Sequence, residues 1–389
     1  MLGRYIEFKN FNTRNKKFKN KKKIFKIFKK LIAEKNDLIL SLDKKYKDSF
    51  PKKIISKLKK IKSVQLIGMG GSILGAKAIY KFLNPKNKNF EFIDNISNVL
   101  PQNYFKKKLV LIISKSGNTL ETISNTSIFT NKKNKNVFIT ENKKNYLTEL
   151  ANELKSEIIH HNNFIGGRYS VLSEVGMLPA QLMGFKVNKF RRLNQLIKNK
   201  NFINSLVLNT TNIFDLIEKK KTNSIILNYD DRSNDLFNWY QQLVAESLGK
   251  KGKGILPVIS TMPKDNHSLM QYYLDGKKNH FFTFFFVKEK KSKKINYKDL
   301  LSSHSFLANK KLNDISYSQF LATENIFRKK EIPFRSFVIN DRNEQTLGEL
   351  FTFFILETII LGRAMKIDPF NQPAVELIKK QTKKILISK

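Results

Sequence analysis

Cysteine is absent from the 389-residue chain. Without a thiol, the protein can form no disulfide, no thiolate-ligated metal site and no iron–sulfur cluster, and it has no cysteine nucleophile. Long apolar runs are also missing: the longest, Leu350–Leu361, contains Glu357 and is shorter than the roughly 20 residues that a membrane-spanning helix needs. The first ten residues lack the apolar segment of a secretory signal. We therefore expect a soluble, cytoplasmic protein with no membrane partner.

Acidic residues and arginine are scarce beside lysine. The chain has 73 Lys and Arg against 32 Asp and Glu, a formal net charge of +41, and only ten of the basic residues are Arg. Base readout and phosphate forks favour the planar guanidinium of arginine over the ammonium of lysine. The excess charge therefore indicates the lysine-rich surface that an AT-rich genome encodes, and we expect no specific nucleic-acid partner.

Strand-like and helical segments alternate along most of the chain, and 41% of the residues are apolar, as in globular proteins. Apolar runs typical of buried strands lie at Val64–Gly68, Leu109–Ser114, Asn136–Thr140, Glu157–His160, Ser224–Asn228, Ile255–Ser260, His280–Val287 and Pro333–Ile339. Helical patterns lie between them and include 173–185, 235–248, 317–328 and 347–365. This order is typical of an α/β fold with mostly parallel sheets.

The alternation restarts after a basic stretch at 186–200, which divides the chain. We predict a basic N-terminal helical arm at 1–50, a first α/β lobe at 51–195, a second lobe at 196–370 and a C-terminal helix at 371–389. In the arm, apolar residues from Phe18 to Ile32 recur at helical spacing among lysines. Such helices sometimes bind membranes or nucleic acid, but we favour packing of the apolar stripe on the next domain.

Two strand–loop–helix junctions of the first lobe are rich in small residues. Gly68-Met-Gly-Gly-Ser72 lets the backbone approach a ligand, but it fits neither the dinucleotide nor the Walker pattern, so a structural turn is an equal alternative. Ser114-Lys-Ser-Gly-Asn-Thr119 carries three hydroxyls, more than helix capping requires. Hydroxyls and amides at a helix start can hold phosphate without a metal, and ligands bind at this edge of α/β sheets. We predict a phosphate site at the second junction.

Candidate acid–base groups lie in the second lobe. Gln242 and Glu246 are four residues apart on one predicted helix and therefore share a face, although for a lone glutamate an exposed helix face that carries it by chance is the favoured reading. Asp265-Asn-His267 follows a proline turn, where a surface cap is the alternative reading of the histidine. The other four histidines show no metal-ligand spacing with His267 or with one another, so we expect no metal site.

Six short motifs follow one another along the chain, at Gly70–Ser72, Ser114–Thr122, Gly166–Ser170, Gln242–Lys250, Asp265–His267 and Gln372–Lys379. Together they resemble the glucose-6-phosphate isomerase family, also called phosphoglucose isomerase. The resemblance covers about residues 64–380. It implies two α/β/α lobes of sugar isomerase (SIS) type and a homodimer, with an active site in a cleft between lobes and chains.

Individual roles follow from this resemblance. Glu246 matches the family's catalytic base, and Arg168 matches the arginine that stabilises the enediolate. His267, contributed by the partner subunit, and Lys379 match the groups that open the sugar ring, and Glu121 matches a carboxylate that orients the histidine. The residues that match the family's substrate contacts are Gly71, Ser72, Ser114, Lys115, Ser116, Thr119 and Gln242. The resemblance implies that the serines and the threonine contact mainly the phosphate.

The implied reaction is the reversible interconversion of glucose 6-phosphate and fructose 6-phosphate, a step of glycolysis and gluconeogenesis that needs no cofactor. The residues favour proton transfer through a cis-enediol over a metal-bound hydride shift. That route needs a ring opener, a carboxylate that moves a proton between C2 and C1, and a cation beside the oxyanion. His267 with Lys379, Glu246 and Arg168 would supply these, each acid–base group contributing on the order of 10²–10⁴ in rate.

Three alternatives remain open from the sequence. One is a related isomerase that also acts on mannose 6-phosphate. Another is a non-catalytic SIS-domain regulator that binds a sugar phosphate; it would need only the phosphate loops, so the four matched catalytic groups argue against it. The third is a nucleic-acid binder, which would be expected to cluster arginine and aromatic residues on a compact module.

Overall fold

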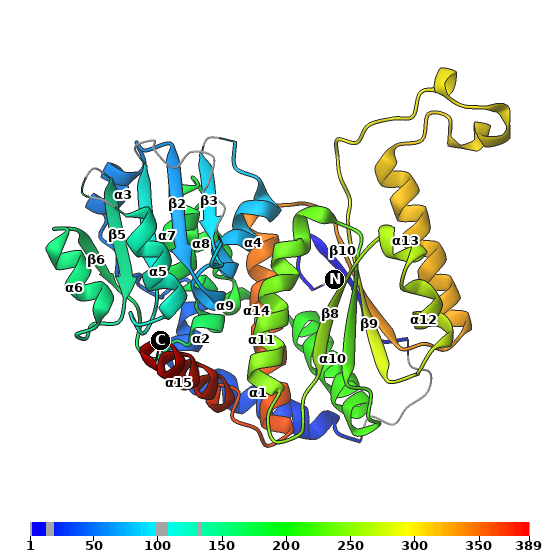
Figure 1. Cartoon of the computed structure of the whole chain (residues 1–389). Coiled ribbons are helices and arrows are strands. Elements are labelled where there is room, and N and C mark those ends of the chain that lie inside the picture. Colours follow the sequence, from blue (N-terminus) through cyan, green and yellow to red (C-terminus); the bar gives the residue numbers. More distant parts are fainter. Residues whose placement is uncertain are drawn as a thin grey trace.

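The computed structural model describes residues 2–12, 19–86, 88–97, 108–130, 132 and 134–388. Two α/β lobes lie side by side, with the helices α4 (Leu74–Leu83), α11 (Asn234–Leu248) and α14 (Glu344–Ala364) between them (Figure 1). Each lobe is built on one five-stranded sheet. The predicted fold class, two lobes with mostly parallel sheets, is confirmed. Among the described residues, no helix is both long and apolar enough to cross a membrane.

The first sheet has the strand order β3-β2-β4-β5-β6, and every neighbouring pair is parallel. Its strands are β2 (Ser63–Gly68), β3 (Asn89–Ile93), β4 (Leu109–Ile113), β5 (Lys135–Thr140) and β6 (Glu157–His160). The central strand β4 is apolar and buried along its whole length, as expected for a sheet covered on both faces. Because the strands all point the same way, the loops that follow them meet at one edge of the sheet.

Helices cover both faces of this sheet (Figure 1). They are α3 (Lys52–Leu58), α4, α5 (Leu120–Phe129), α6 (Tyr146–Glu153), α7 (Glu174–Leu182), α8 (Val187–Phe190) and α9 (Leu193–Leu196), with the 3-10 turns η1 (Gly70–Ser72) and η2 (Gly167–Leu172). The helix α4, which buries the small residues Gly75, Ala76 and Ala78, packs on α11 of the second lobe. Both 3-10 turns also contact α11, so the lobes are joined where η1 and η2 meet that helix.

The second sheet has the order β1-β10-β9-β7-β8, in which only β1 is antiparallel to its neighbour. Its strands are β1 (Ile6–Lys9), β7 (Asn223–Asn228), β8 (Leu256–Thr261), β9 (His280–Val287) and β10 (Phe334–Ile339). Every residue of β9 is buried. Its phenylalanines alternate between two cores, with Phe281 and Phe285 on the α11 and α14 face and Phe282 and Phe284 on the opposite face.

The remaining elements of the second lobe complete these two layers. They are α10 (Lys200–Glu218), η3 (Asp231–Ser233), η4 (Lys264–His267), α12 (Met270–Asp275), η5 (Tyr297–Asp299), η6 (Ser302–Leu307) and α13 (Leu312–Lys329). The segment that carries η5 and η6 stands away from the body of the lobe (Figure 1). Its Leu301 and Phe306 side chains are 80% and 66% exposed.

The N-terminal arm contains α1 (Lys21–Ala33) and α2 (Asp37–Ser41), preceded by strand β1. The predicted amphipathic helix corresponds to α1, although Phe18 lies outside the described residues. Its apolar stripe is buried at Ile24, Phe28 and Leu31, and α1 packs on α10 and α14. The stripe is therefore covered as expected, but by the second lobe and not by the lobe that follows it in sequence.

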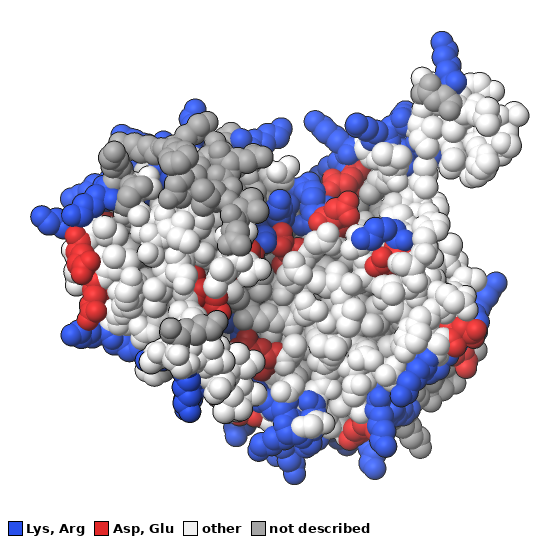
Figure 2. Space-filling view, viewed as in Figure 1, with Lys and Arg blue, Asp and Glu red and all other residues white. Residues whose placement is uncertain are grey.

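Lysine and arginine side chains are scattered around the rim of the face shown in Figure 2, with wide uncharged areas between them. Acidic side chains lie among them, several close to the junction of the two lobes. On this face, the described basic side chains form no single continuous stripe.

Candidate functional site

The site is built around Glu246, near the C-terminal end of α11. Gln242 lies one turn earlier, and its Nε2 donates a hydrogen bond of 3.0 Å to Glu246 Oε2, as their four-residue spacing predicts. The Oε1 atom of Gln242 is buried and has no hydrogen-bond partner among the described residues. The amide therefore fixes one carboxylate oxygen of Glu246, while its own carbonyl oxygen is left without a partner among the described residues.

Arg168 brings the first lobe to this carboxylate. It lies in η2, is only 3% exposed, and its Nη1 is 3.1 Å from Glu246 Oε1. Its Nε donates to Ser247 Oγ at 2.8 Å. The other N–H groups bind the segment before the C-terminal helix, at the carbonyl oxygens of Pro369 (2.7 Å) and Asn371 (3.2 Å) and at Gln372 Oε1 (2.9 Å). All five donors of the guanidinium are engaged, which fixes its plane beside Glu246.

Glycines let the first junction lie directly against these groups. A Cβ on Gly71 would be 2.1 Å from the carbonyl carbon of Gly167, the residue before Arg168. Gly70 has a φ of +51°, and a Cβ there would be 2.6 Å from Gln242 Nε2. The backbone of the Gly70–Ser72 turn is therefore packed against both Arg168 and Gln242, which a larger residue at either glycine would prevent.

The predicted phosphate loop follows β4 at the same edge of the first sheet. Ser114 is buried, and its Oγ lies 2.9 Å from Thr119 Oγ1. Thr119 precedes α5 but makes no capping hydrogen bond with its side chain, so the first N–H groups of the helix can bind an anion. Ser116 Oγ accepts the backbone N–H two residues further on. Gly117, with a φ of +67°, has no room for a Cβ, because Asn145 Oδ1 would lie 1.9 Å away.

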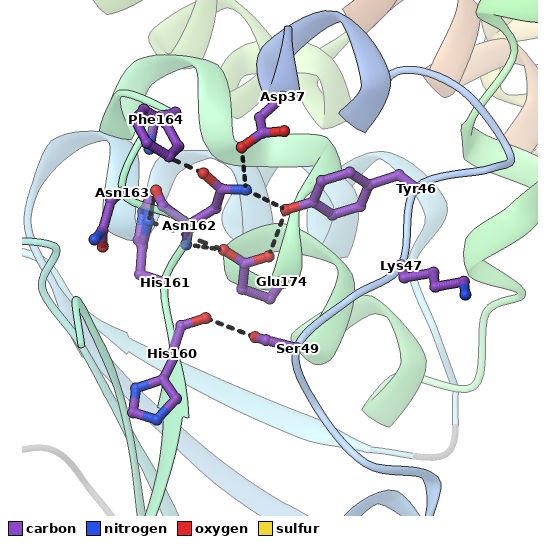
Figure 3. Close-up of a pocket in the computed structure, with 10 residues that line it drawn as sticks. All are labelled: Asp37, Tyr46, Lys47, Ser49, His160, His161, Asn162, Asn163, Phe164 and Glu174. Atoms are coloured by element: carbon purple, nitrogen blue, oxygen red, sulfur yellow. Dashed lines mark hydrogen bonds and ion pairs between the residues drawn. The ribbon is translucent and has the colours of Figure 1, made fainter.

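Lys115 turns its side chain away from this loop, toward β6. Its Nζ donates to the carbonyl oxygen of Asn163 at 2.8 Å and lies 3.4 Å from Glu141 Oε1. Asn163 belongs to the lining of a neighbouring pocket of about 290 Å³ (Figure 3). The lining residues are Asp37, Tyr46, Lys47, Ser49, His160, His161, Asn162, Asn163, Phe164 and Glu174. The ammonium of Lys115 is thus already paired with groups outside the phosphate loop.

The pocket in Figure 3 ties the chain before Arg168 to the N-terminal arm. The backbone N–H of Asn162 donates to Glu174 Oε1 at 2.7 Å, and its side chain donates to Asp37 Oδ2 at 3.2 Å. Tyr46 donates its hydroxyl to Glu174 Oε2 at 3.0 Å, and burial raises the pKa of Tyr46. Burial lowers the pKa of His161 to about 4, so this ring is neutral at pH 7. The loop from β6 to η2 is therefore held on a fixed polar network.

His267 lies exposed at the end of η4, away from Glu246. The helix α11 follows β7 and leads back to the start of the parallel strand β8, so Glu246 lies toward the amino ends of these strands. His267 follows β8 and therefore lies at their carboxyl ends, at the opposite edge of the second lobe. The turn is held by Asp265 Oδ2, which accepts a hydrogen bond of 2.9 Å from Ser260 Oγ. Glu121 is half-buried in the first turn of α5, and no interaction among the described residues links it to His267. The single chain does not bring the predicted ring-opening histidine to the predicted base.

Lys379 is exposed on α15 (Pro373–Ser388), and its Nζ lies 2.6 Å from Glu376 Oε1. None of the described residues of this helix is buried, and Leu377 and Ile378 are 69% and 71% exposed. The helix begins directly after Gln372, which Arg168 binds. The start of α15 is thus anchored at the site, whereas the ammonium of Lys379 pairs within its own helix.

The sequence motifs contained three groups at this site to which we assigned no role. Ser247 accepts the hydrogen bond of Arg168 Nε, and its Oγ also lies 2.8 Å from the Tyr169 hydroxyl. Lys250 Nζ donates to the carbonyl oxygen of Asp368 at 2.6 Å, and burial, reinforced by Arg168, lowers the pKa of Lys250. Their positions in the sequence could have indicated Ser247 and Tyr169, because Ser247 directly follows the candidate base and Tyr169 directly follows the candidate arginine.

Among the described residues, no group of three or more His, Asp or Glu side chains is placed to hold a metal ion.

Two α/β lobes with mostly parallel sheets, joined where Arg168 meets Glu246 and with a hydroxyl-rich loop at an edge of the first sheet, define a two-lobed fold of SIS type. Residues 44–260 match the family described as phosphoglucose isomerase. The glucose-6-phosphate isomerase of Methanocaldococcus jannaschii is 34% identical over 336 residues, 82% of each chain. The chain belongs to the phosphoglucose isomerase family.

Solved structures share this fold. A hypothetical protein of Thermus thermophilus gives a TM-score of 0.81 at 22% identity, covering 94% of this chain and 95% of that one. A glucose-6-phosphate isomerase of Chlamydia trachomatis gives a TM-score of 0.72 at 16% identity, covering 97% of this chain and 88% of that one. Both similarities extend over the two lobes and support the same overall architecture.

Proposed function

We propose that this protein interconverts glucose 6-phosphate and fructose 6-phosphate, the reaction named for its relatives. The observation that carries the proposal is the contact of 3.1 Å between Arg168 Nη1 and Glu246 Oε1, at the junction of both lobes and beside the Gly70–Ser72 turn. It joins a candidate base and a buried cation at one point. A regulator that only bound a sugar phosphate would not need this pair.

The phosphate of the substrate would bind at the loop after β4. Ser114, Ser116 and Thr119 offer hydroxyls, and Lys115 offers its backbone N–H, at the open N-terminus of α5. These groups neutralise a dianion through hydrogen bonds and the positive end of the helix dipole. Ser72, at the neighbouring turn, is proposed to contact the phosphate as well. Substrate contacts of Gly71 and Gln242 are proposed at the sugar, on the side where the unpartnered Gln242 Oε1 lies.

The proton transfer would use Glu246 as the single base that moves a proton between C2 and C1. When Glu246 accepts the proton it loses its charge, and the negative charge moves to the oxygen of the enediolate. Arg168 then stabilises that oxygen in place of the carboxylate, so the buried guanidinium keeps an anionic partner throughout. A hydrogen-bonding group placed for this charge is worth on the order of 10²–10³ in kcat.

Ring opening would need a second copy of the chain. We propose a homodimer in which the partner's histidine, equivalent to His267, reaches the site of each chain, with Glu121 orienting it. The surface position of His267 and the exposed apolar residues Leu301 and Phe306 support an interface. Lys379 is proposed to assist ring opening, since α15 starts at the residues that Arg168 anchors.

The proposed reaction is a step of glycolysis and gluconeogenesis, and we propose the cytoplasm as its location. The test is a coupled assay on fructose 6-phosphate with the wild-type protein and Glu246→Gln. Glu149→Gln, an exposed carboxylate on α6, is the matched control. Loss of at least about a hundredfold in kcat is expected for Glu246→Gln only.

A folded wild-type protein without isomerase activity would refute the proposed function. Near-normal activity of Glu246→Gln would instead refute the assignment of the base while leaving the reaction in place. Circular dichroism and a thermal melt of each variant separate loss of activity from loss of structure.

A further inference from the structure

A small cationic cavity lies on the second lobe, apart from the residues discussed so far. Its volume is about 150 Å³, and its lining consists of Lys221, Lys278, His280, Lys330, Glu331, Ile332 and Pro333. These residues precede β7, begin β9 and precede β10, so the cavity opens at the amino ends of three neighbouring parallel strands. It is on the face covered by α12 and α13, whereas α11 with Glu246 covers the opposite face.

Two of the three lysines that line the cavity, Lys221 and Lys278, are held in place by backbone carbonyl groups. Lys221 Nζ donates to the carbonyl oxygen of Lys278 at 2.6 Å, and Lys278 Nζ donates to the carbonyl oxygen of Leu274 at 2.6 Å. Among the described residues, no carboxylate forms an ion pair with Lys221, Lys278 or Lys330. Each ammonium has three N–H groups, so donors remain for a ligand.

His280 forms the buried wall of the cavity. The residue is 2% exposed, and its ring packs against Phe282 and Tyr273. The backbone of Tyr273 interacts with the ring and favours its protonated form, whereas Nε2 is buried without a hydrogen-bond partner among the described residues. An unpaired polar atom at such depth costs free energy unless a ligand or a water reaches it.

The positive charges around the cavity repel one another in the unliganded protein. Burial, together with the nearby Lys278, lowers the pKa of Lys221, and burial with both lysines lowers the pKa of His280. The other titratable groups around the ring are Tyr272 and Tyr273 from α12, and Lys330 and Glu331 after α13. An anion in the cavity would relieve the repulsion between the lysines and give the protonated His280 an acceptor.

We propose that this cavity is a second anion site, which binds the tetrahedral oxyanion of inorganic phosphate or of a phosphomonoester. Lys221, Lys278 and Lys330 supply the charge, and His280 donates from Nε2 once it is protonated. The volume admits a phosphoryl group but is below the roughly 300 Å³ of pockets that enclose a larger organic ligand. In a phosphomonoester, the organic group would stay outside.

The test is NMR of the histidine Cε1–H signals, because the chain has only five histidines. The protein carries Ser114→Ala and Thr119→Val to weaken the proposed substrate site, and His280→Asn identifies the His280 signal. Inorganic phosphate, added at a constant ionic strength near pH 6.5, is expected to move this signal toward its protonated position. Lys221→Met with Lys278→Met should weaken the apparent affinity by about tenfold or more.

The matched control replaces Lys277 and Lys329, exposed neighbours outside the lining, with methionine and should leave the titration unchanged. Glycerol 3-phosphate distinguishes the two sources of the oxyanion: a shift with either compound supports the site and shows which one enters. An unmoved His280 signal with both compounds would overturn the proposal. So would an equal shift with chloride, or equal weakening by the control pair.

Discussion

The guanidinium of Arg168 lies 3.1 Å from the carboxylate of Glu246, although 78 residues separate them in sequence and they belong to different lobes. Arg168 also binds the segment before α15 through Pro369, Asn371 and Gln372. Three distant parts of the chain therefore meet at one buried cation. A buried charge needs a fixed counter-charge, and Glu246 supplies it here. The same contact joins the two lobes and lies at the centre of the proposed active site.

Replacing Arg168 with lysine should lower kcat by on the order of 10²–10³, with a smaller change in KM. The five contacts of the guanidinium fit a planar fork, which the three N–H groups of an ammonium cannot reproduce. Steady-state kinetics on fructose 6-phosphate measures both constants. Arg363→Lys, in an exposed pair with Glu34, is the control and should keep normal activity; an equal loss there would contradict the role of Arg168.

Removing the hydroxyls of Ser114 and Thr119 together should raise KM about a hundredfold or more and change kcat less. Each hydroxyl would lose one hydrogen bond to a charged phosphate, and such bonds are worth about 1.5–3 kcal/mol. Ser124→Ala is the control, because among the described residues the Ser124 hydroxyl bonds only its own helix, at the Leu120 carbonyl. The phosphate assignment would fail if the double variant kept the wild-type KM.

Mixing inactive Glu246→Gln chains with inactive His267→Ala chains should restore activity. If His267 acts in the partner's site, a mixed dimer contains one site with both native residues, and random pairing yields about one quarter of wild-type activity. The structure motivates the experiment because His267 and Glu246 lie at opposite edges of the second lobe. No recovery after verified subunit exchange would show that both residues act within one chain, or that one assignment is wrong.

The protein should lose stability as the pH falls from 6.5 toward 4 because of His161. Burial lowers its pKa to about 4 in the folded chain, while the unfolded chain keeps a value near 6.5 and binds the proton more readily. Stability that is complete above pH 6.5 is therefore lost on acidification, by roughly 2 kcal/mol at pH 5. Urea unfolding at pH 7 and pH 5 measures this loss.

His161→Gln should remove that part of the pH dependence, and His160→Gln, which replaces an exposed ring, should preserve it. Equal pH slopes for the wild-type protein and His161→Gln would contradict the burial of a neutral His161.

Most of the fold could be predicted because its central strands are buried along their whole length. Continuous apolar runs such as β4 and β9 have no polar face, and their alternation with helices indicates parallel sheets. We did not predict β1 and β3, because four or five residues that alternate apolar and charged side chains give a weak signal. The helix α10 was also not predicted, since its asparagines and threonines favour turns locally and only tertiary burial decides their state.

The site was predictable where its residues are neighbours along one element. The Gln242–Glu246 pair follows from helical spacing, and its hydrogen bond confirms that these side chains share a face. The five-fold binding of Arg168 could not be inferred, because its partners lie up to 204 residues away. Lys115 also lies within a predicted motif, but its side chain pairs with Glu141, a residue with no pattern of its own. The roles of His267, Lys379 and Glu121 stay predictions.

The most direct measurement of the central claim is the conversion of fructose 6-phosphate in D₂O, followed by proton NMR at C2 of the product. The wild-type protein is expected to form glucose 6-phosphate and to incorporate solvent deuterium at C2, because Glu246 exchanges its proton in the enediol state. Glu246→Gln should do neither while keeping its fold. A folded wild-type protein that forms no product, or a Glu246→Gln variant that exchanges and converts at the wild-type rate, would contradict the account.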